Sequence, residues 1–358
     1  MRIIVDAMGG DFAPAEIVYG VVKAIKEYNY DIVLVGDQRL IDQELSKYPD
    51  VKKDKIFIVH TEEVVTMEDS PSQILRSKKN SSLHIGLKML KNGEGSGFFS
   101  AGNTGAIMAI SKLCLKTIEG VDRPAIGAVM PSLKGHTVMI DAGANVDCKP
   151  IHFLQFAIMG TAYAKIILGV ENPTVKLLSI GEEDVKGNEI TKSVFKVLQN
   201  FREINFKGNI EGKEIFKGVC DVIVCDGFAG NIALKASESA WMYISTLLRE
   251  ELTRNIVSKL GAFLVKGAFK RVKKRVDYAE YGGAPLLGVN GAVIIGHGSS
   301  NSIAVKNGIR VAGELAEQKI TSLIEQGIKD SYSVMKVDKT ETFWNNIVEK
   351  FKKIKRED

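Results

Sequence analysis

The first 28 residues read MRIIVDAMGGDFAPAEIVYGVVKAIKEY, and they contain the unit from which the fold is built. Residues 3–5 form a short β-branched run, residues 6–11 (DAMGGD) form a polar glycine loop, and residues 15–28 have the spacing of an amphipathic helix. Near-continuous apolar runs of this kind are typical of strands that are covered on both faces. The stretch therefore predicts a strand, a glycine loop and a helix in succession.

The same unit recurs along the chain. Further strands are predicted at residues 32–35, 56–59, 98–100, 126–129, 138–140, 177–180, 222–225 and 293–295. Further helices are predicted at residues 81–91, 153–168, 189–201, 232–251 and 302–325. This alternation indicates an α/β fold with a mainly parallel, doubly wound sheet. We expect one catalytic domain over residues 1–335, followed by an amphipathic tail helix over residues 336–358.

The composition is that of a globular protein with a large core, because 45% of the 358 residues are hydrophobic and 25% are charged. The four cysteines show no CxxC spacing, so we interpret them as reduced thiols of a cytoplasmic protein, with Cys225 as a minor candidate for a catalytic thiol. No cluster has metal-ligand spacing.

The chain starts directly with a predicted strand, and no apolar run approaches the roughly 18 residues that span a bilayer. We therefore expect contact with a membrane but no crossing.

Polar glycine loops follow six of the predicted strands. Besides residues 6–11, they are residues 101–105 (AGNTG), 141–145 (DAGAN), 181–187 (GEEDVKG), 226–231 (DGFAGN) and 297–301 (HGSSN). In an open α/β sheet such loops line one crevice at the carboxyl ends of the strands. Glycine allows close approach of the backbone to a ligand, and each following helix directs free N–H groups at it. The loops predict an anion site, although each one alone is also explained as a tight turn.

Three common enzyme signatures are missing from the sequence. There is no GxGxxG at the start of a first helix, which disfavours a nicotinamide dehydrogenase, and no GxxxxGK[ST] for a P-loop nucleotide site. There is also no GxSxG for a serine acyl-enzyme. We therefore expect a site that holds an anion and a carbonyl without a covalent nucleophile.

The loops and their flanking residues resemble the bacterial PlsX family, the acyl-acyl carrier protein:phosphate acyltransferases of phospholipid synthesis. The matching blocks are DAMGGDFAP (6–14), SAGNTGA (100–106), RPAI (123–126), DAGAN (141–145), IGEEDVKGNE (180–189), DGFAGN (226–231), YGGAPLLGVNG (281–291) and HGSSN (297–301). They span residues 1 to about 330 in the family's order. Only the C-terminal tail extends beyond the usual family pattern.

This resemblance implies a fold similar to isocitrate and isopropylmalate dehydrogenases and to phosphotransacetylase, usually as a homodimer. It implies transfer of a fatty acyl group from acyl carrier protein to inorganic phosphate, with no metal or redox cofactor. A membrane-bound glycerol-3-phosphate acyltransferase would then use the acyl phosphate, so the protein is expected to be cytoplasmic and peripherally membrane associated.

Lys186 and Asn231 are the candidate catalytic residues. Lys186 would bind phosphate and neutralise its charge, while Asn231 would donate its amide to the thioester oxygen or to phosphate. A solvated lysine and a helix N-cap are the respective structural alternatives. The wider phosphate- and substrate-binding set comprises Asp6, Gly9, Gly10, Asn103, Thr104, Gly105, Asp141, Asn145, Gly181, Glu183, Asp184, Asp226, Gly230 and His297.

Different roles are expected within this set. Asn103 and Asn145 would supply further hydrogen-bond donors. The carboxylates would orient these donors, because a carboxylate that touched phosphate directly would repel it. His297 is a candidate acid for the leaving thiolate, although a lone histidine at a strand end is more often structural.

Residues 254–275 carry eight Lys or Arg and no Asp or Glu, with aliphatic residues at helical spacing. This composition is typical of an interfacial helix on anionic lipid. The expected contact residues are Leu260, Phe263, Leu264, Lys266, Lys270 and Arg271. Docking of acidic acyl carrier protein and packing at a dimer interface remain open alternatives. The apolar face of residues 338–356 is a second candidate for lipid contact or for packing on the body.

Three alternative functions differ in how well they fit the sequence. A phosphotransacetylase-like enzyme that uses acyl-coenzyme A would need the same anion and thioester chemistry. A non-catalytic anion-binding or membrane scaffold protein would bind phosphate without forming acyl phosphate. Nucleic acid is disfavoured as a partner, because the basic segment is interleaved with aliphatic residues and lacks stacking aromatics beyond phenylalanine.

Overall fold

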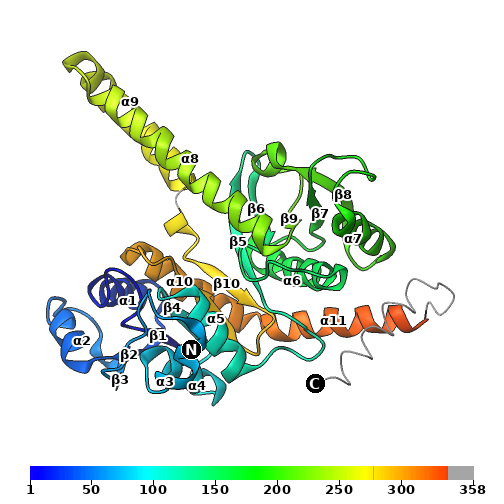
Figure 1. Ribbon diagram of the computed structural model, residues 1–358. Coiled ribbons are helices and arrows are strands. Elements are labelled where there is room, and N and C mark those ends of the chain that lie inside the picture. The colour runs from blue at the N-terminus through cyan, green and yellow to red at the C-terminus, as the bar shows by residue number, and fades with distance from the viewer. Residues whose placement is uncertain (277, 338–358) are drawn as a thin grey trace.

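A single twisted sheet of eleven strands runs through the computed structural model, which describes residues 1–276 and 278–337 (Figure 1). The strands are β1 (Arg2–Asp6), β2 (Asp31–Gly36), β3 (Ile56–His60), β4 (Gly97–Ser100), β5 (Ala125–Ser132), β6 (Gly135–Ile140), β7 (Thr174–Ser179), β8 (Asn205–Glu211), β9 (Val222–Val224), β10 (Ala284–Leu287) and β11 (Ala292–Ile295). Their order across the sheet is β3-β2-β1-β4-β11-β10-β5-β6-β9-β7-β8. The predicted α/β class with a mainly parallel sheet is confirmed.

The sheet consists of two parallel blocks that run in opposite directions. Strands β3, β2, β1, β4 and β11 are mutually parallel, and so are β6, β9, β7 and β8. Between the blocks, β10 pairs antiparallel with both β11 and β5, and β5 pairs antiparallel with β6. Hence the six glycine loops leave the sheet as two groups of three. The predicted convergence of all six loops on one crevice is thus modified, because the chain reverses direction at β5 and β10.

Eleven helices are described, of which nine cover the two faces of this sheet and two, α8 and α9, stand away from it. They are α1 (Ala15–Tyr28), α2 (Gln38–Leu45), α3 (Pro71–Ser77), α4 (Ser82–Lys91), α5 (Thr104–Leu115), α6 (Pro150–Leu168), α7 (Glu189–Asn200), α8 (Gly227–Thr253), α9 (Ile256–Val276), α10 (Ser302–Glu317) and α11 (Ile320–Val337). One large apolar cluster joins α1, α6, α7 and α10 to one face, and a second joins α4 and α5 to the other. Three short 3₁₀ turns lie at Lys53–Lys55, Gly212–Lys217 and Tyr278–Glu280.

Every strand predicted from an apolar run is present, and α1 begins and ends where its pattern predicted. Strands β8 and β10 were not predicted. Lys207 and Asn209 interrupt the apolar pattern of β8, and β10 has only four residues, of which Pro285 is the second. The single helix expected over residues 302–325 is divided into α10 and α11, because Lys319 adopts a left-handed backbone with φ 52°.

Helix α6 is the one described helix that is long and apolar enough to cross a membrane by length and composition. The expectation that no segment reaches this limit was therefore wrong. However, 67% of its apolar window is buried, and α6 packs against β6, β9, α7 and α11. In this structure it is a core helix.

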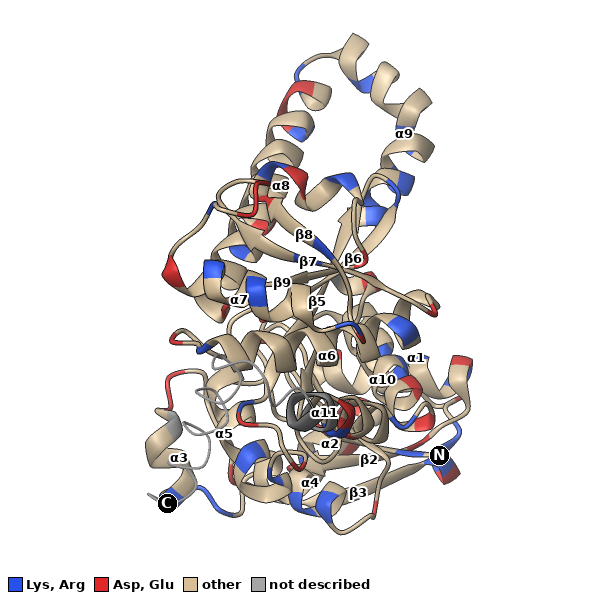
Figure 2. Cartoon of the chain, turned by 90° about the vertical axis from the view of Figure 1, so that its right-hand side faces the viewer, with Lys and Arg blue, Asp and Glu red and all other residues tan. Residues whose placement is uncertain are grey.

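The two helices α8 and α9 form a hairpin that stands away from the sheet (Figures 1 and 2). Only Gly227 and Gly230, both in the first turn of α8, are buried, and α9 has no buried residue. The predicted basic amphipathic helix over residues 254–275 is thus confirmed as a helix, and its side chains are exposed. Of the predicted tail helix over residues 336–358, residues 336–337 are the end of α11, and residues 338–358 lie outside the described residues.

Close contact between α1 and α10 generates a test of the packing. Gly20 of α1 lies against α10, so that an added Cβ would lie 2.4 Å from Cβ of Val305. We expect Gly20→Ala to destabilise the protein by about 1–3 kcal/mol, because the two helices must separate. Thermal unfolding followed by circular dichroism measures the change.

The matched control is Gly261→Ala on α9, where no atom lies within 4 Å of the added Cβ. Alanine is the better helix former by about 1 kcal/mol, so this variant should unfold at the same temperature or higher. Equal destabilisation by both substitutions would contradict the proposed contact.

Candidate active site

The polar residues of the glycine loops begin the helices that follow them. Asn103 accepts a hydrogen bond from the N–H of Ala106 at the start of α5, and Asp226 accepts one from Ala229 at the start of α8. Asn188 and Asn301 cap α7 and α10 in the same way. Capped helices hold their first N–H groups in fixed directions, which is the geometry that binds anions.

The first group of loops follows β1, β4 and β11. Asp6, which is 3% exposed, accepts hydrogen bonds from the Ser100 hydroxyl at 2.7 Å and from the N–H of Met8 at 3.1 Å. The N–H of Asp11 donates to the carbonyl of Gly298 at 2.8 Å. Burial raises the pKa of the Asp6 carboxyl above its ordinary value, and these hydrogen bonds oppose the rise. Asp6 therefore joins the loop after β1 to the loop after β4, and the backbone bond from Asp11 to Gly298 joins the loop after β11 to them.

The second group of loops follows β6, β9 and β7. Fully buried Asp141 accepts hydrogen bonds from the N–H groups of Ile126, Gly143, Ala144 and Asn145 and from the Asn145 side chain, at 2.7–3.1 Å. Burial raises its pKa, and these donors oppose the rise. Asp141 thus connects β5 to the 141–145 loop and has no free acceptor for a substrate.

Gly230 places α8 directly on this loop. A Cβ at Gly230 would lie 1.9 Å from the carbonyl oxygen of Asp141, so only glycine permits the approach. The N–H of Gly227 also donates to the carbonyl of Asn145 at 2.7 Å. The N-terminus of α8 is therefore packed against the 141–145 loop.

A pocket of about 390 Å³ joins the two groups of loops. Its lining residues are Gly105, Met108, Ala109, Lys112, Arg123, Pro124 and Asn145. The first four lie at positions i, i+3, i+4 and i+7 of α5, and therefore on one face of the helix. At 1.5 Å per residue, the pocket extends about 10 Å along α5 from its N-terminus. Asn145 contributes from the loop after β6, so residues from both parallel blocks meet here.

The charge of this pocket is positive. Lys112 lies in the last turn of α5, and its side-chain ammonium makes no hydrogen bond or ion pair with the described residues. The Arg123 guanidinium donates one hydrogen bond to the carbonyl of Asp147 at 2.8 Å, which leaves further N–H donors for a ligand. The N-terminus of α5 adds the positive end of a helix dipole beside Gly105. The pocket can therefore hold an anion, with Met108, Ala109 and Pro124 as an apolar wall.

Two predicted donors are already used within the protein. The Asn103 amide donates to the carbonyls of Met67 and Asp69, and the Asn145 amide donates to Asp141 and to the carbonyl of Pro124. In this structure both amides hold the loops in place and do not point a free donor at the pocket.

The two candidate catalytic residues are exposed in the loops of the second group. Asn231 lies inside α8 and not at its N-cap, since Asp226 fills that position, so the alternative explanation of Asn231 as a cap was wrong. Its amide lies next to Gly143, where an added Cβ would be 3.5 Å from Oδ1 of Asn231. Lys186 lies over Gly181, two residues before the N-cap of α7. Among the described residues, neither side chain makes a hydrogen bond or an ion pair with another.

The remaining predicted residues lie around these loops. Glu183 and Asp184 are exposed, and the carbonyl of Glu183 accepts a hydrogen bond from Asn209. His297 is exposed in the first group of loops, where its Nδ1 is 2.7 Å from the Ser299 hydroxyl. Thr104 is exposed at the first position of α5.

The structure gives no support to a catalytic cysteine. All four cysteines are buried and free, and burial raises the pKa of the Cys148 and Cys220 thiols to about 12 and that of Cys225 well above its ordinary value. A thiol is nucleophilic only as the thiolate, so these groups are inert at neutral pH. Within the described part of the chain, no group of three or more His, Cys, Asp or Glu side chains is arranged to hold a metal ion.

Sequence reasoning missed Lys112 and assigned no role to Arg123. Arg123 is the first residue of the RPAI block, but the sequence does not show where its side chain points. Lys112 belongs to α5, a helix that was not predicted because its apolar residues are not confined to one stripe. The signal available in the sequence was the position of Lys112 seven residues after Gly105, which places both on one face of a helix.

The chain is similar to proteins of a known family over most of its length. Residues 1–323 match a family described as fatty acid synthesis protein. The phosphate acyltransferase of Halothermothrix orenii is 49% identical over 330 residues, covering 92% of this chain and 98% of the relative. That of Aquifex aeolicus is 48% identical over 337 residues, covering 92% and 99%.

Solved structures with the same fold are more distant in sequence. A phosphotransacetylase from Streptococcus pyogenes superimposes with a TM-score of 0.61 at 16% identity, covering 88% of this chain and 94% of that one. A 4-hydroxythreonine-4-phosphate dehydrogenase from Klebsiella pneumoniae gives a TM-score of 0.50 at 12% identity, covering 88% and 99%. These likenesses confirm the predicted fold, whereas the sequence relatives show the family: the chain belongs to the phosphate acyltransferases of fatty acid and phospholipid synthesis.

Proposed function

We propose that this phosphate acyltransferase takes its fatty acyl group from acyl carrier protein and that inorganic phosphate attacks the thioester directly. The observation that carries the proposal is the positive pocket along α5, where Lys112, Arg123 and the helix N-terminus surround space for an anion. Its apolar wall suits the thioester end of an acyl carrier. The described cysteines are buried, so no thiolate competes with phosphate for the carbonyl.

The chemistry requires placement more than acid or base catalysis. Phosphate is already an anionic nucleophile at neutral pH, and a thiol with a pKa of about 8.5 is a good leaving group. One phosphate oxygen forms a bond to the carbonyl carbon, the carbon–sulfur bond breaks, and the carrier leaves as a thiolate that takes a proton from water. Lys112 and Arg123 would hold the phosphate, while Asn231 and Lys186 would stabilise the oxyanion as it develops.

A phosphotransacetylase-like reaction with acyl-coenzyme A is the second candidate, because the structural neighbours include phosphotransacetylases. Turnover of a matched pair of thioesters, one on acyl carrier protein and one on coenzyme A, separates the two donors. Faster formation of acyl phosphate from the coenzyme A thioester would contradict the proposal.

We also propose that the protein is cytoplasmic and works as a peripheral membrane homodimer that hands its product to a membrane-bound glycerol-3-phosphate acyltransferase. The support comes from the tip of the α8–α9 hairpin, where Ile256 is 85% and Leu264 is 76% exposed. Lysine and arginine flank these apolar side chains (Figure 2). Further exposed apolar residues along α8, such as Met242 and Tyr243, offer a surface for a second copy.

Charge removal in the pocket is the first test of the site. We expect Lys112→Ala and Arg123→Ala each to lower kcat/KM for phosphate by about 10- to 100-fold, because each removes a charge-assisted contact to the anion. Arg123→Lys should recover part of the loss. Steady-state formation of acyl hydroxamate from acyl-acyl carrier protein and phosphate measures the rates.

Lys26→Ala is the control for this pair, since Lys26 is exposed on α1 and lies outside the pocket. Unchanged rates in both pocket variants would remove the pocket as the phosphate site.

The proposed roles of Asn231 and Lys186 are tested by a separate measurement. If Asn231 or Lys186 stabilises the oxyanion, then Asn231→Ala and Lys186→Ala should each lower kcat by about 10²- to 10³-fold with little change in KM. The thermal unfolding temperature should be unchanged, since both side chains are exposed. Rates within a few-fold of the parent would show that these residues do not take part.

Membrane association is tested by flotation with liposomes. Binding should require anionic lipid and should weaken more than tenfold in Leu260→Asp/Phe263→Asp, because each buried apolar side chain contributes roughly 1.5–3 kcal/mol. Leu40→Asp/Leu323→Asp changes two leucines that are 41% and 42% exposed elsewhere on the surface, and it should bind as the parent does. Binding that ignored lipid charge and survived the hairpin substitutions would contradict this proposal.

A further inference from the structure

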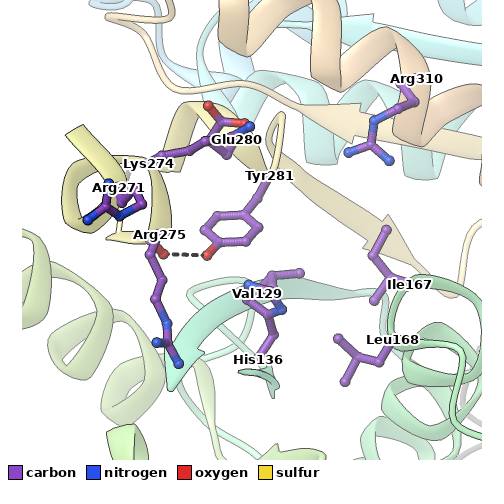
Figure 3. A pocket seen from close by; sticks show the side chains of 10 residues that line it. All are labelled: Val129, His136, Ile167, Leu168, Arg271, Lys274, Arg275, Glu280, Tyr281 and Arg310. Atoms are coloured by element: carbon purple, nitrogen blue, oxygen red, sulfur yellow. Dashed lines mark hydrogen bonds between the residues drawn. The ribbon is translucent and has the colours of Figure 1, made fainter. Parts of the chain in front are cut away.

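A second pocket lies on the opposite face of the sheet from the active-site pocket. Its volume is about 500 Å³, within the range of roughly 300–1,000 Å³ that is usual for small-molecule sites. It is lined by Val129, His136, Ile167, Leu168, Arg271, Lys274, Arg275, Glu280, Tyr281 and Arg310 (Figure 3). Val129 packs with the α6 side of the core, whereas its neighbour Ala128 packs with the α5 side. The two pockets are therefore separated by the sheet.

One side of this second pocket is aliphatic. Val129 comes from β5, and Ile167 and Leu168 come from the last turn of α6. All three are only partly buried, so they present apolar surface that the fold itself does not cover. Such surface gains free energy when a hydrocarbon chain covers it.

The opposite side is cationic. Figure 3 shows the base of α9, with Arg271, Lys274 and Arg275, across the hollow from Arg310 of α10. Arg275 is used structurally, because its Nη2 donates to the carbonyls of Ser132 and Leu133 at 2.7 Å. The side chains of Arg271 and Lys274 make no hydrogen bond or ion pair with other described residues. They are therefore the cations available to a ligand.

The Arg310 guanidinium points into the hollow (Figure 3). Its Nη1 is paired with Glu314 at 2.7–2.8 Å, which leaves its other N–H groups for a ligand. Glu280 is the carboxylate in the lining, against four cationic side chains, so the local charge stays positive. His136 stacks edge-on against Tyr281, and burial together with nearby Arg275 lowers its pKa, so its ring is neutral at pH 7.

We propose that this second pocket binds a single-chain anionic amphiphile, an acyl chain that ends in a phosphate or carboxylate. The chain would cover Val129, Ile167 and Leu168, and the head group would lie between Lys274 and Arg310. Free phosphate would leave the aliphatic side uncovered, and a neutral amphiphile would leave the cations unpaired. An anion held between α9 and α10 would also tie the base of the hairpin to the body of the protein.

Binding of dodecyl phosphate, measured by calorimetry below its micellar concentration, tests this proposal. Because the active-site pocket also attracts anions, the measurements use the Lys112→Gln/Arg123→Gln background. We expect one saturable site there, which inorganic phosphate and the neutral dodecyl maltoside do not displace. Loss of charge in Lys274→Gln/Arg310→Gln should weaken binding at least about tenfold.

Two further variants control for folding and for general charge. Leu168→Asp places a carboxylate on the aliphatic side without altering any cation, and it should weaken binding to a similar extent. Lys196→Gln/Lys207→Gln removes two exposed charges on α7 and β8, outside the lining, and should bind as the background does. The proposal fails if no saturable site exists, if inorganic phosphate displaces the probe, or if this last variant loses as much affinity as Lys274→Gln/Arg310→Gln.

Discussion

The hydrogen bonds of the Asp141 carboxylate are the interaction on which the candidate active site depends. This carboxylate lies fully buried at the end of β6 and collects five hydrogen bonds, four of them from backbone N–H groups. One of these donors belongs to β5, the strand at which the sheet changes direction. A buried carboxylate is costly unless its acceptors are filled, so this arrangement specifies one loop conformation. That conformation places Asn145 in the pocket wall and presents the Asp141 carbonyl to Gly230.

The glycine loops serve structure and chemistry with the same residues. Their Asn and Asp side chains cap the following helices, which aims the helix N-termini at the crevice, and their glycines permit backbone contacts such as that of Gly230. A ligand in the pocket would contact the N-terminus of α5. The Asn103 amide would not contact it, because that amide donates to the carbonyls of Met67 and Asp69. This division explains why several polar loop residues hold the site together without facing the pocket. The charged groups that do face it, Lys112 and Arg123, come from outside the glycine loops.

The molecule also separates its positive charge into three places. The active-site pocket lies against α5, the second pocket lies across the sheet beside α6 and α10, and the hairpin carries lysines and arginines away from the body. At physiological ionic strength charges interact over roughly 8 Å, so each region acts as a separate anion-attracting surface. The base of α9 is the exception, since it belongs both to the hairpin and to the second pocket.

Much of the fold was determined by the sequence itself, because the relevant signals are local. The apolar runs predicted nine strands at their observed places, the spacing in residues 15–28 predicted α1, and the composition of residues 254–275 predicted an exposed basic helix. Each of these follows from periodicity and from neighbours within a few residues. The glycine loops likewise indicated an anion site before any geometry was known.

Only the tertiary structure decided how these loops are combined. The reversal at β5 and β10 divides them into two groups. One face of α5 then places Gly105 and Lys112 in one pocket with Arg123, which precedes β5, and with Asn145. The tertiary structure also decided that the side-chain amides of Asn103 and Asn145 donate their hydrogen bonds within the protein. The side chains of Asn231 and Lys186 are exposed instead. Sequence lists which donors are present, but strand direction and hydrogen-bond partners depend on residues far away in the chain. For that reason the chemistry was readable from the sequence, and the assignment of individual side chains was not.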